Sequence, residues 1–341
     1  MRSILIVFFA SILFISFKNG PADQIKSDNF ELVELSDGVY GCIHKFGGKA
    51  ICNVGIVDNG KETLIFDSFL SPDVAEELLN AVKEMGLSPV KYVVNSHFHN
   101  DHIRGNQVFS KDVKIISTRM TKELIEEEEP LQIAYEKENA PGRLFYYDSL
   151  YNSFVGDKQS REYKQILMWR PYYETLSNSH IEVKTELPNL FVDSILNLNG
   201  PNRKIQLISK GEGHTPSDLI MYLPDDRILF TGDLLFNKCH PYVAHGNISK
   251  WKEWLDFMYS LEVSNLMPGH GQIGPKELIE QMKNYLLDLE SSAEDLVKNN
   301  VPIEKPENFI IPEKYTDWWF DRFYEYNLRF AYESLNTKKT K

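Results

Sequence analysis

Short apolar runs separated by glycine-containing turns dominate the first part of this chain. The predicted strands there span residues 30–33, 38–44, 51–57, 63–66, 90–94 and 113–116. Gly38 and Gly60 follow an aspartate and an asparagine, which is typical of tight turns between strands. Ser71 and Pro72 favour the start of a helix, because serine caps helix ends and proline suits the first turn. Apolar residues then follow helical spacing until Gly86.

This alternation of strand and helix stops between about residues 120 and 195. The segment begins with a run of glutamates at 126–129 and continues with many aromatic residues. We interpret it as a mostly helical insert in the core fold, with the glutamates on a solvated helix face. Its aromatic residues either cover a functional site and shape a pocket or, as is more usual, pack the insert onto the body.

Strand and helix patterns resume after the insert. The predicted strands span residues 204–208, 219–222 and 228–231. Ser249 is predicted to cap a helix that carries Trp251 and Trp254, and a further helix spans about 276–297. Residues 312–335 are predicted to form a packed amphipathic helix. We therefore divide the chain into an N-terminal segment 1–20, a main domain 28–300 that contains the insert, and a helical extension 301–341.

The first twenty residues differ from the rest. Arg2 precedes an almost wholly apolar run from Ile4 to Phe17, which is short for a membrane span and typical of a signal peptide. We expect export to the periplasm or outside the cell, or an N-terminal anchor if the segment is not cleaved. The formal net charge of -12 opposes contact with nucleic-acid phosphates. We expect a small-molecule substrate, no nucleic-acid partner, and membrane contact only through an uncleaved N-terminal segment.

Histidine and aspartate gather in five separate segments of the chain. The densest lies directly after the predicted strand 90–94, where three histidines and an aspartate occur within six residues. Packing these groups together is costly unless a cation compensates for their lost hydration. Imidazole and carboxylate together suit borderline divalent metals. The candidate metal ligands are His97, His99, Asp101, His102, His214, Asp233 and His270.

The spacing of these ligands predicts two neighbouring ions. His97 and His99 project to the same side of an extended segment, so they can share one ion. We assign His97, His99 and His214 to a first ion, and Asp101, His102 and His270 to a second. Asp233 would bridge the two, because a carboxylate has two oxygens. Asp67 ends a predicted strand and could accept an N–H from the histidine loop, which would fix its orientation.

The remaining histidines and the cysteines are weaker candidates. A structural or surface role is assigned to His44, His180, His240 and His245, of which the last two are also weak pocket candidates. The three cysteines are too few for a disulfide scaffold. Cys42 and Cys52 could form a disulfide or remain as two buried thiols, and both alternatives stay open. Cys239 follows Asp233 by six residues, but its spacing does not make it a ligand.

In their order along the chain, the five motifs resemble those of the metallo-β-lactamase superfamily. The resemblance covers most of the chain from about residue 30 to 275. It implies an α+β fold, a four-layer αβ/βα sandwich with the metals at one edge of the two sheets, here with a helical insert and C-terminal helices. It also implies a dinuclear zinc hydrolase, with two Zn²⁺ as cofactors and iron or manganese as possible substitutes.

The ligands predict a mechanism as well as a metal site. Two cations would lower the pKa of a bridging water, and the resulting hydroxide would attack a carbonyl polarised by the first metal. Asp101 would orient that hydroxide while it ligates a metal, so it is the predicted catalytic residue. An ester, lactone, thioester or β-lactam would satisfy this geometry.

This sequence differs from better-known branches of the superfamily at a few positions, and these differences exclude few substrate classes. Zinc β-lactamases often replace the bridging aspartate, and one group carries lysine three residues later, where homoserine-lactone hydrolases tend to carry tyrosine. This chain keeps Asp233 and has Phe236 at that offset, so both activities are less favoured. The weak substrate-pocket candidates are Phe236, Lys238, His240 and Tyr242. The alternatives are a β-lactamase proper, a mononuclear iron oxidoreductase acting on persulfides, and a non-catalytic metal-binding protein.

Overall fold

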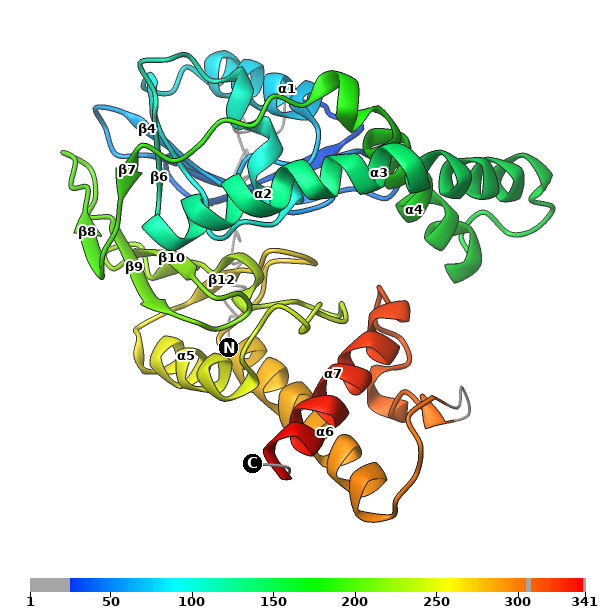
Figure 1. Ribbon diagram of the computed structural model, residues 1–341. Coiled ribbons are helices and arrows are strands. Elements are labelled where there is room, and N and C mark those ends of the chain that lie inside the picture. Colours follow the sequence, from blue (N-terminus) through cyan, green and yellow to red (C-terminus); the bar gives the residue numbers. More distant parts are fainter. Residues whose placement is uncertain (1–24, 305–307, 340–341) are drawn as a thin grey trace, which may run out of the picture.

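Two β-sheets form the centre of the protein in the computed structural model, which describes residues 25–304 and 308–339 (Figure 1). The first sheet contains, in spatial order, β1 (Phe30–Ser36), β2 (Val39–His44), β3 (Val54–Asp58), β4 (Thr63–Phe66), β5 (Val90–Val94), β6 (Lys114–Ser117) and β7 (Leu190–Phe191). Strands β1 to β4 pair antiparallel, whereas β4 to β7 pair parallel. The loops that follow the parallel strands therefore meet at one edge of the sheet.

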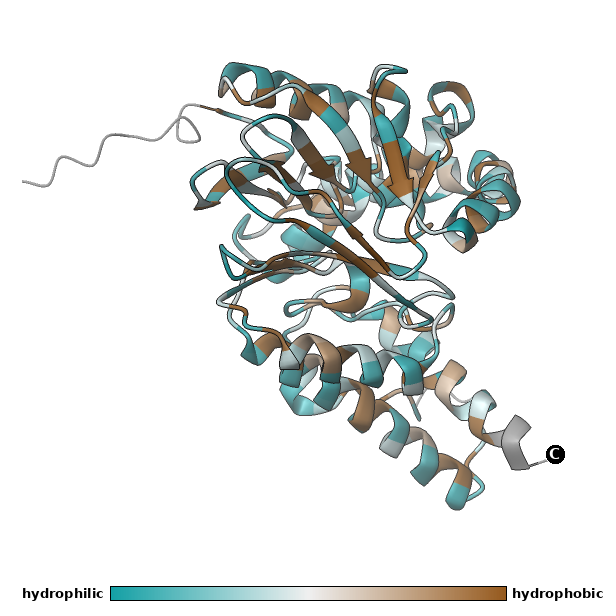
Figure 2. Ribbon diagram, turned by 90° about the vertical axis from the view of Figure 1, so that its left-hand side faces the viewer, coloured by the Kyte–Doolittle hydropathy of each residue, from teal (hydrophilic) through white to brown (hydrophobic). Residues whose placement is uncertain are grey.

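The second sheet faces the first across an apolar layer. Its spatial order is β12 (Asn265–Met267), β11 (Ile228–Phe230), β10 (Asp218–Leu223), β9 (Gln206–Gly211) and β8 (Ile195–Asn197). Leu64 and Val94 from the first sheet and Leu219 and Phe230 from the second are fully buried in a common cluster. Figure 2 shows that apolar residues concentrate on these strands, between helices whose outer faces are hydrophilic.

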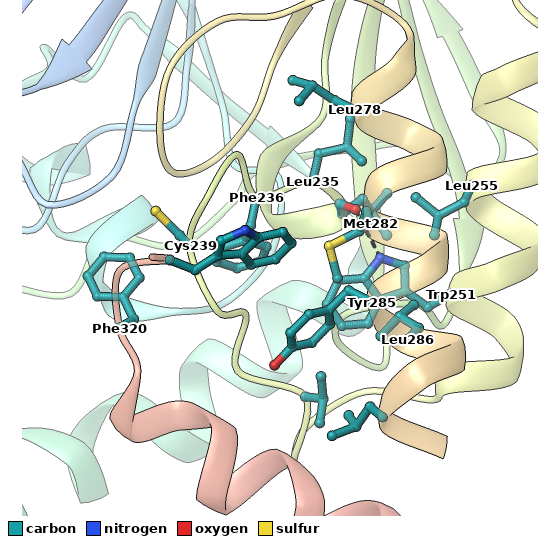
Figure 3. Close-up of a cluster of buried hydrophobic side chains, with 14 of the residues drawn as sticks. Leu235, Phe236, Cys239, Trp251, Leu255, Leu278, Met282, Tyr285, Leu286 and Phe320 are labelled. Carbon is teal, nitrogen blue, oxygen red and sulfur yellow. Dashed lines mark hydrogen bonds between the residues drawn. The ribbon is translucent and has the colours of Figure 1, made fainter. Parts of the chain in front are cut away.

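Helices cover the outer face of each sheet. Helix α1 (Pro72–Glu84) packs Val74 and Leu78 against the first sheet. The second sheet is covered by α5 (Ile248–Ser260) and α6 (Glu277–Lys298), with α7 (Arg322–Lys339) packed beside α6. Figure 3 shows Trp251 and Leu255 of α5 facing Met282, Tyr285 and Leu286 of α6. The order helix, sheet, sheet, helix is the predicted four-layer α+β sandwich, which the structure confirms.

The insert is a pair of long helices on one side of the sandwich (Figure 1). They are α3 (Arg119–Ser153) and α4 (Arg161–Glu182), and they pack along each other. The predicted insert ran to about residue 195, but β7 and β8 already return the chain to the two sheets. The prediction that the whole glutamate run is solvated is wrong for Glu129. Its carboxylate is buried and accepts a hydrogen bond of 2.7 Å from Arg104 Nε.

Three other local predictions also differ from the structure. The strand predicted over 51–57 begins at Val54, because Ile51 has a positive φ of 66°. Helix α5 is capped by Asn247 rather than Ser249, since the Asn247 side chain accepts a 3.2 Å hydrogen bond from the Lys250 amide. The single helix predicted over 312–335 is a short 3₁₀ turn, Glu313–Tyr315, followed by α7.

The sequence left two structural questions open: whether two of the cysteines form a disulfide, and whether the chain contacts a membrane. Cys42, Cys52 and Cys239 are buried free thiols, so the alternative of a disulfide between the first two is not found. Among the described residues, no helix has the length and apolar character that crossing a membrane requires. The segment predicted to be a signal peptide or anchor, residues 1–20, lies outside the described residues, and export stays a prediction.

Candidate metal centre

Four loops at the sheet edges bring the predicted ligands together. His97 follows β5 by three residues, and Asp101 and His102 lie in the one-turn helix α2 (Asn100–Ile103). Asp233 lies in a 3₁₀ turn, Gly232–Leu234, directly after β11. Gly232 has a positive φ of 53°, and a Cβ there would lie 2.5 Å from the Ser96 side chain. Only glycine permits this close approach of the Asp233 turn to the histidine loop.

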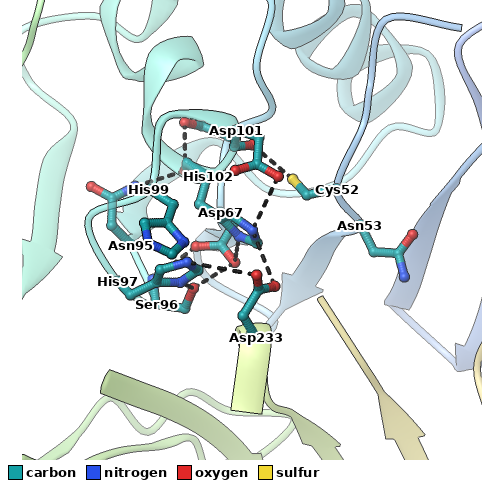
Figure 4. A network of polar contacts seen from close by, with 12 residues as sticks. Cys52, Asn53, Asp67, Asn95, Ser96, His97, His99, Asp101, His102 and Asp233 are labelled. Carbon is teal, nitrogen blue, oxygen red and sulfur yellow. Dashed lines mark hydrogen bonds and ion pairs between the residues drawn. The ribbon is translucent and has the colours of Figure 1, made fainter. Parts of the chain in front are cut away.

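Asp233 lies close to four of the histidines, and Figure 4 shows its carboxylate pointing toward His97 and His102. Its Oδ2 lies 3.8 Å from His97 Nε2, 3.5 Å from His214 Nε2 and 3.4 Å from His270 Nε2. Its Oδ1 lies 3.2 Å from His102 Nε2. Oδ2 thus faces His97, His214 and His270, whereas Oδ1 faces His102, so the carboxylate lies between histidines of both predicted groups.

Two sets of ligand atoms share this carboxylate, and within each set the atoms lie within 4.8 Å of one another. The first set is His97, His99, His214 and Asp233, and the second is His102, Asp233 and His270. Asp101 joins the second set, because its Oδ2 is 3.3 Å from His270 Nε2 and 3.5 Å from His102 Nε2. The structure thus brings all seven predicted ligands together, and Asp101 also forms a compact group with His102 and the Cys52 thiol, which was not predicted as a site residue.

The donor atoms fit a pair of divalent cations. His97 Nε2, His102 Nε2 and Asp233 Oδ1 are buried and have no hydrogen-bond partner. Buried polar atoms without partners are costly, and bound cations would satisfy them. Burial lowers the pKa of His214 to about 4, which favours the neutral imidazole that a metal ligand needs. At His270 burial acts in the same direction, but Asp233 and Asp101 outweigh it and raise the pKa to about 9, so a cation bound there would have to displace a proton. Burial opposes the ionisation of Asp101, but His102 and His270 outweigh it and bring its pKa to about 2.

Asp67 makes polar contacts with the histidine loop (Figure 4). Its fully buried carboxylate accepts hydrogen bonds from the Ser96 amide at 2.7 Å and the Ser96 hydroxyl at 2.9 Å. It also lies 2.8 Å from His102 Nδ1, so His102 Nε2 faces Asp233. Such a partner fixes both the tautomer and the direction of a ligating histidine. Asp67 therefore has the position predicted from the sequence.

His99 presents a different nitrogen from its neighbours. Its Nδ1 lies 3.2 Å from His214 Nε2 and faces the cluster, while its Nε2 lies 2.8 Å from His245 Nδ1. His245 was only a weak pocket candidate in the sequence. It lies 146 residues away along the chain, and no local spacing connects it to His99.

A cavity of about 520 Å³ opens over the cluster. Phe236, Tyr242 and His245 line it, as predicted for pocket residues. The structure does not place Lys238 and His240 in its wall. The Lys238 ammonium pairs with Asp317 at 3.0 Å and lies beside a neighbouring cavity of about 320 Å³. His240 is buried and hydrogen-bonds to other residues, so its role is structural.

The sequence model of the metallo-β-lactamase superfamily matches residues 47–270. The chain belongs to this superfamily. It is 23% identical over 241 residues to a metallo-β-lactamase type 2 from Bacillus cereus, covering 69% of this chain and 73% of the relative. It is 24% identical over 272 residues to the protein of the same name from Bacteroides fragilis, covering 76% and 86%.

The chain is also similar to a sulfatase in sequence and to a solved metallo-β-lactamase in structure. The chain is 23% identical over 234 residues to a linear primary-alkylsulfatase from a Pseudomonas species, covering 66% of this chain and 42% of the relative. A metallo-β-lactamase from Pontibacter korlensis matches in structure with a TM-score of 0.54 at 17% identity, covering 76% of this chain and 100% of that one. At this identity the match supports the superfamily fold alone.

The superfamily match ends at residue 270, but the cavity wall does not. Phe320 and Phe323 line the cavity from the C-terminal extension, and Leu131 and Tyr135 line it from α3. None of these four was predicted as a site residue. The core of the superfamily thus supplies the candidate ligands, whereas the insert and the extension supply much of the wall.

Proposed function

We propose that this protein is a dinuclear metal-dependent hydrolase, with zinc as the expected metal, that activates water for attack on a carbonyl. The position of Asp233 between two sets of histidines carries this proposal. When bound there, divalent cations would lower the pKa of water and polarise the carbonyl oxygen. Iron or manganese would suit the same imidazole and carboxylate donors.

The role proposed for Asp101 follows from its charge and place. Its carboxylate lines the cavity and, with a pKa of about 2, stays ionised at neutral pH. It can therefore accept a hydrogen bond from the attacking water and orient it toward a carbonyl in the cavity. His97, His99 and His214 would hold one cation and Asp101, His102 and His270 the other, with Asp233 shared between them.

The relatives support hydrolysis more than any one substrate. Those named above are β-lactamases and an alkylsulfatase, which are hydrolases for different bonds. We therefore propose an ester, lactone, thioester or β-lactam as the substrate class. A small-molecule substrate and export across the membrane, which the apolar run at 4–17 predicts, are proposals of the same standing.

Metal analysis combined with ester turnover tests this function. Purified full-length protein is expected to contain about two divalent ions and to hydrolyse nitrophenyl acetate. We expect His99→Ala and Asp101→Ala to lower turnover about a hundredfold or more, with an unchanged circular dichroism spectrum. Asp112→Ala, which alters an exposed carboxylate just before β6, is the control and is expected to retain full turnover.

Other results would select an alternative. A single bound iron together with oxygen consumption in the presence of a persulfide would identify the oxidoreductase. Two bound metals without turnover of any ester, lactone, thioester or β-lactam would identify a metal-binding protein without this activity. Equal turnover in the wild type and in Asp101→Ala would refute the assigned role of Asp101.

A further inference from the structure

The wall of the 520 Å³ cavity is formed mainly by large apolar side chains. Trp169 and Tyr172 come from α4, Phe320 and Phe323 from the C-terminal extension, and Leu131 and Tyr135 from α3. Clefts of this size and composition bind ligands chiefly by excluding water from their apolar surface. Whatever reacts at the metal centre must therefore fit among these side chains.

Two sets of contacts hold this wall in place. On α3, buried Glu129 and Glu136 pair with Arg104, which follows α2, and Glu136 also accepts a 3.0 Å hydrogen bond from Asn100. In the C-terminal extension, the backbone of Trp319 pairs with the loop after Asp233: the Trp319 amide donates to Lys238 and the His240 amide to Trp319, each at 2.8 Å. The apolar wall is thus fixed to the segments that carry the candidate ligands.

The mouth of the cavity exposes apolar surface to water. Leu131 and Tyr135 lie four residues apart on α3 and are 62% and 68% exposed, although both line the cavity. Exposed apolar groups at the rim of a cleft indicate a ligand that would cover them. Phe145 and Tyr146, farther along the same helix, are also exposed but lie outside this wall.

Away from the candidate ligands, the described part of the chain places no cation in the cavity wall that could meet a bound anion. The carboxylates of this wall are Asp101, Glu136 and Asp233, and no lysine or arginine belongs to the wall among residues 25–304 and 308–339. Arg322 stacks on the lining ring of Trp169, with its guanidinium carbon 3.4 Å from the ring centre. Its Nη1 donates a 2.7 Å hydrogen bond to the Tyr173 hydroxyl, and it is not part of the wall.

We propose that the substrate is an uncharged ester or lactone whose acyl or aryl group is large and apolar, and that a carboxylate on that group weakens binding. The inference rests on the proposed hydrolase function and names its substrate class. The apolar group would lie among Trp169, Tyr172 and Phe323, and its outer end would cover Leu131 and Tyr135. A carboxylate placed there would lose its hydration without meeting a cation.

Chain length and charge can be varied separately in nitrophenyl esters, assayed with the metal-loaded, full-length protein. From the acetate through the butanoate to the octanoate, kcat/KM is expected to rise roughly 10- to 100-fold, because each buried methylene contributes up to about fourfold. The hexanoate is expected to exceed the monoester of hexanedioic acid, which has the same length but ends in a carboxylate, by about tenfold or more.

Variants of exposed residues on α3 test whether the cavity wall causes the dependence of kcat/KM on chain length. Leu131→Ala and Tyr135→Ala are expected to lower kcat/KM for the octanoate roughly three- to tenfold and to change the acetate less than about twofold. Phe145→Ala and Tyr146→Ala, on the same helix, are expected to leave both esters unchanged. Because all four side chains are largely exposed, these variants should fold as the wild type does.

A binding measurement separates this inference from the hydrolase proposal. Neutral phenylnaphthylamine fluoresces in apolar sites without being hydrolysed, and anilinonaphthalene sulfonate is its charged counterpart. We expect tighter binding of the neutral dye, weakened by Leu131→Ala but not by Phe145→Ala. If the dyes bind in this way but no ester is hydrolysed, the hydrolase proposal is refuted and the apolar binding site is supported. If esters are hydrolysed with no dependence on chain length, or faster with a terminal carboxylate, the substrate inference is overturned.

Discussion

Replacing Asp67 by asparagine tests how the fold prepares the metal centre without removing a candidate ligand. Asp67 Oδ2 receives both the Ser96 hydroxyl at 2.9 Å and His102 Nδ1 at 2.8 Å. Asparagine has nearly the same shape but no charge, and one of its two polar atoms is a donor. Asp67→Asn therefore removes the charge that holds His102. The NH₂ group of the asparagine must also face a donor of Ser96 or His102, so one hydrogen bond is replaced by a contact between two donors.

The size of the effect follows from these contacts. A hydrogen bond to a charged group contributes about 1.5–3 kcal/mol. Loss of the carboxylate partner of a ligating histidine lowers metal affinity about 10–100-fold. His102 faces the second set of ligands and contacts Asp67 directly, whereas His97 is linked to Asp67 through the Ser96 hydroxyl, which lies 2.9 Å from His97 Nδ1. We thus expect one of the two ions to weaken by about that factor and the other to change much less.

Graded chelation is the suitable assay. Zinc-loaded wild type and Asp67→Asn are dialysed against increasing concentrations of a chelator, and the zinc that remains is measured by elemental analysis. Asp58→Asn provides the same chemical change in a carboxylate that accepts hydrogen bonds from the Gly60 and Ser88 amides. Equal retention of both ions in Asp67→Asn and in this control would show that Asp67 does not support the second site.

Three further changes test other parts of the structure. Asp233→Ala should release the second ion first, because the shared carboxylate is lost; two tight ions in a metal titration would contradict a bridge. Arg104→Ala leaves Glu129 and Glu136 buried without their cation and should lower the free energy of unfolding in urea by about 3–5 kcal/mol. The exposed Arg119→Ala should cost less than about 1 kcal/mol. Burial raises the pKa of Asp218 to about 8, so the folded protein holds a proton that the unfolded chain releases. Stability should then fall by up to about 1.4 kcal/mol per pH unit between about pH 4 and 8, and Asp218→Asn should flatten that slope; parallel slopes would refute the shift.

The candidate ligands could be predicted because the residues that identify them lie close together in the sequence. Three histidines and an aspartate lie within six residues after β5, and a strand end fixes where the loop after it begins. The downstream ligands, such as His214, could be added because each stands in a short turn with a neighbouring glycine. The parallel pairing of β4 with β5 then brings Asp67 beside the histidine loop.

The cavity wall could not be predicted, because its contacts are distant in sequence. Glu129 resembles its solvated neighbours until Arg104, 25 residues earlier, is placed against it. The predicted N-cap of α5 was wrong for a more local reason. Asn247 and Ser249 both suit a helix start, and only the backbone geometry selects Asn247. In the C-terminal extension, helical periodicity cannot show that Trp319 forms a strand-like bridge with Cys239.

That loop gives the wall and the metal centre a common support. The Asn237 amide donates to the His270 carbonyl at 3.0 Å, and Trp319 pairs with Lys238, the next residue along the loop. Phe320 follows in a strained conformation with a φ of 61°, and its ring meets the His270 imidazole edge-on at 5.5 Å between centres. A shift of Phe320 toward a bound apolar group would therefore act on His270 through both the ring contact and the backbone. The position of His270, a candidate ligand, should therefore depend on what fills the cavity, and we expect a cation held by His270 to respond to substrate size.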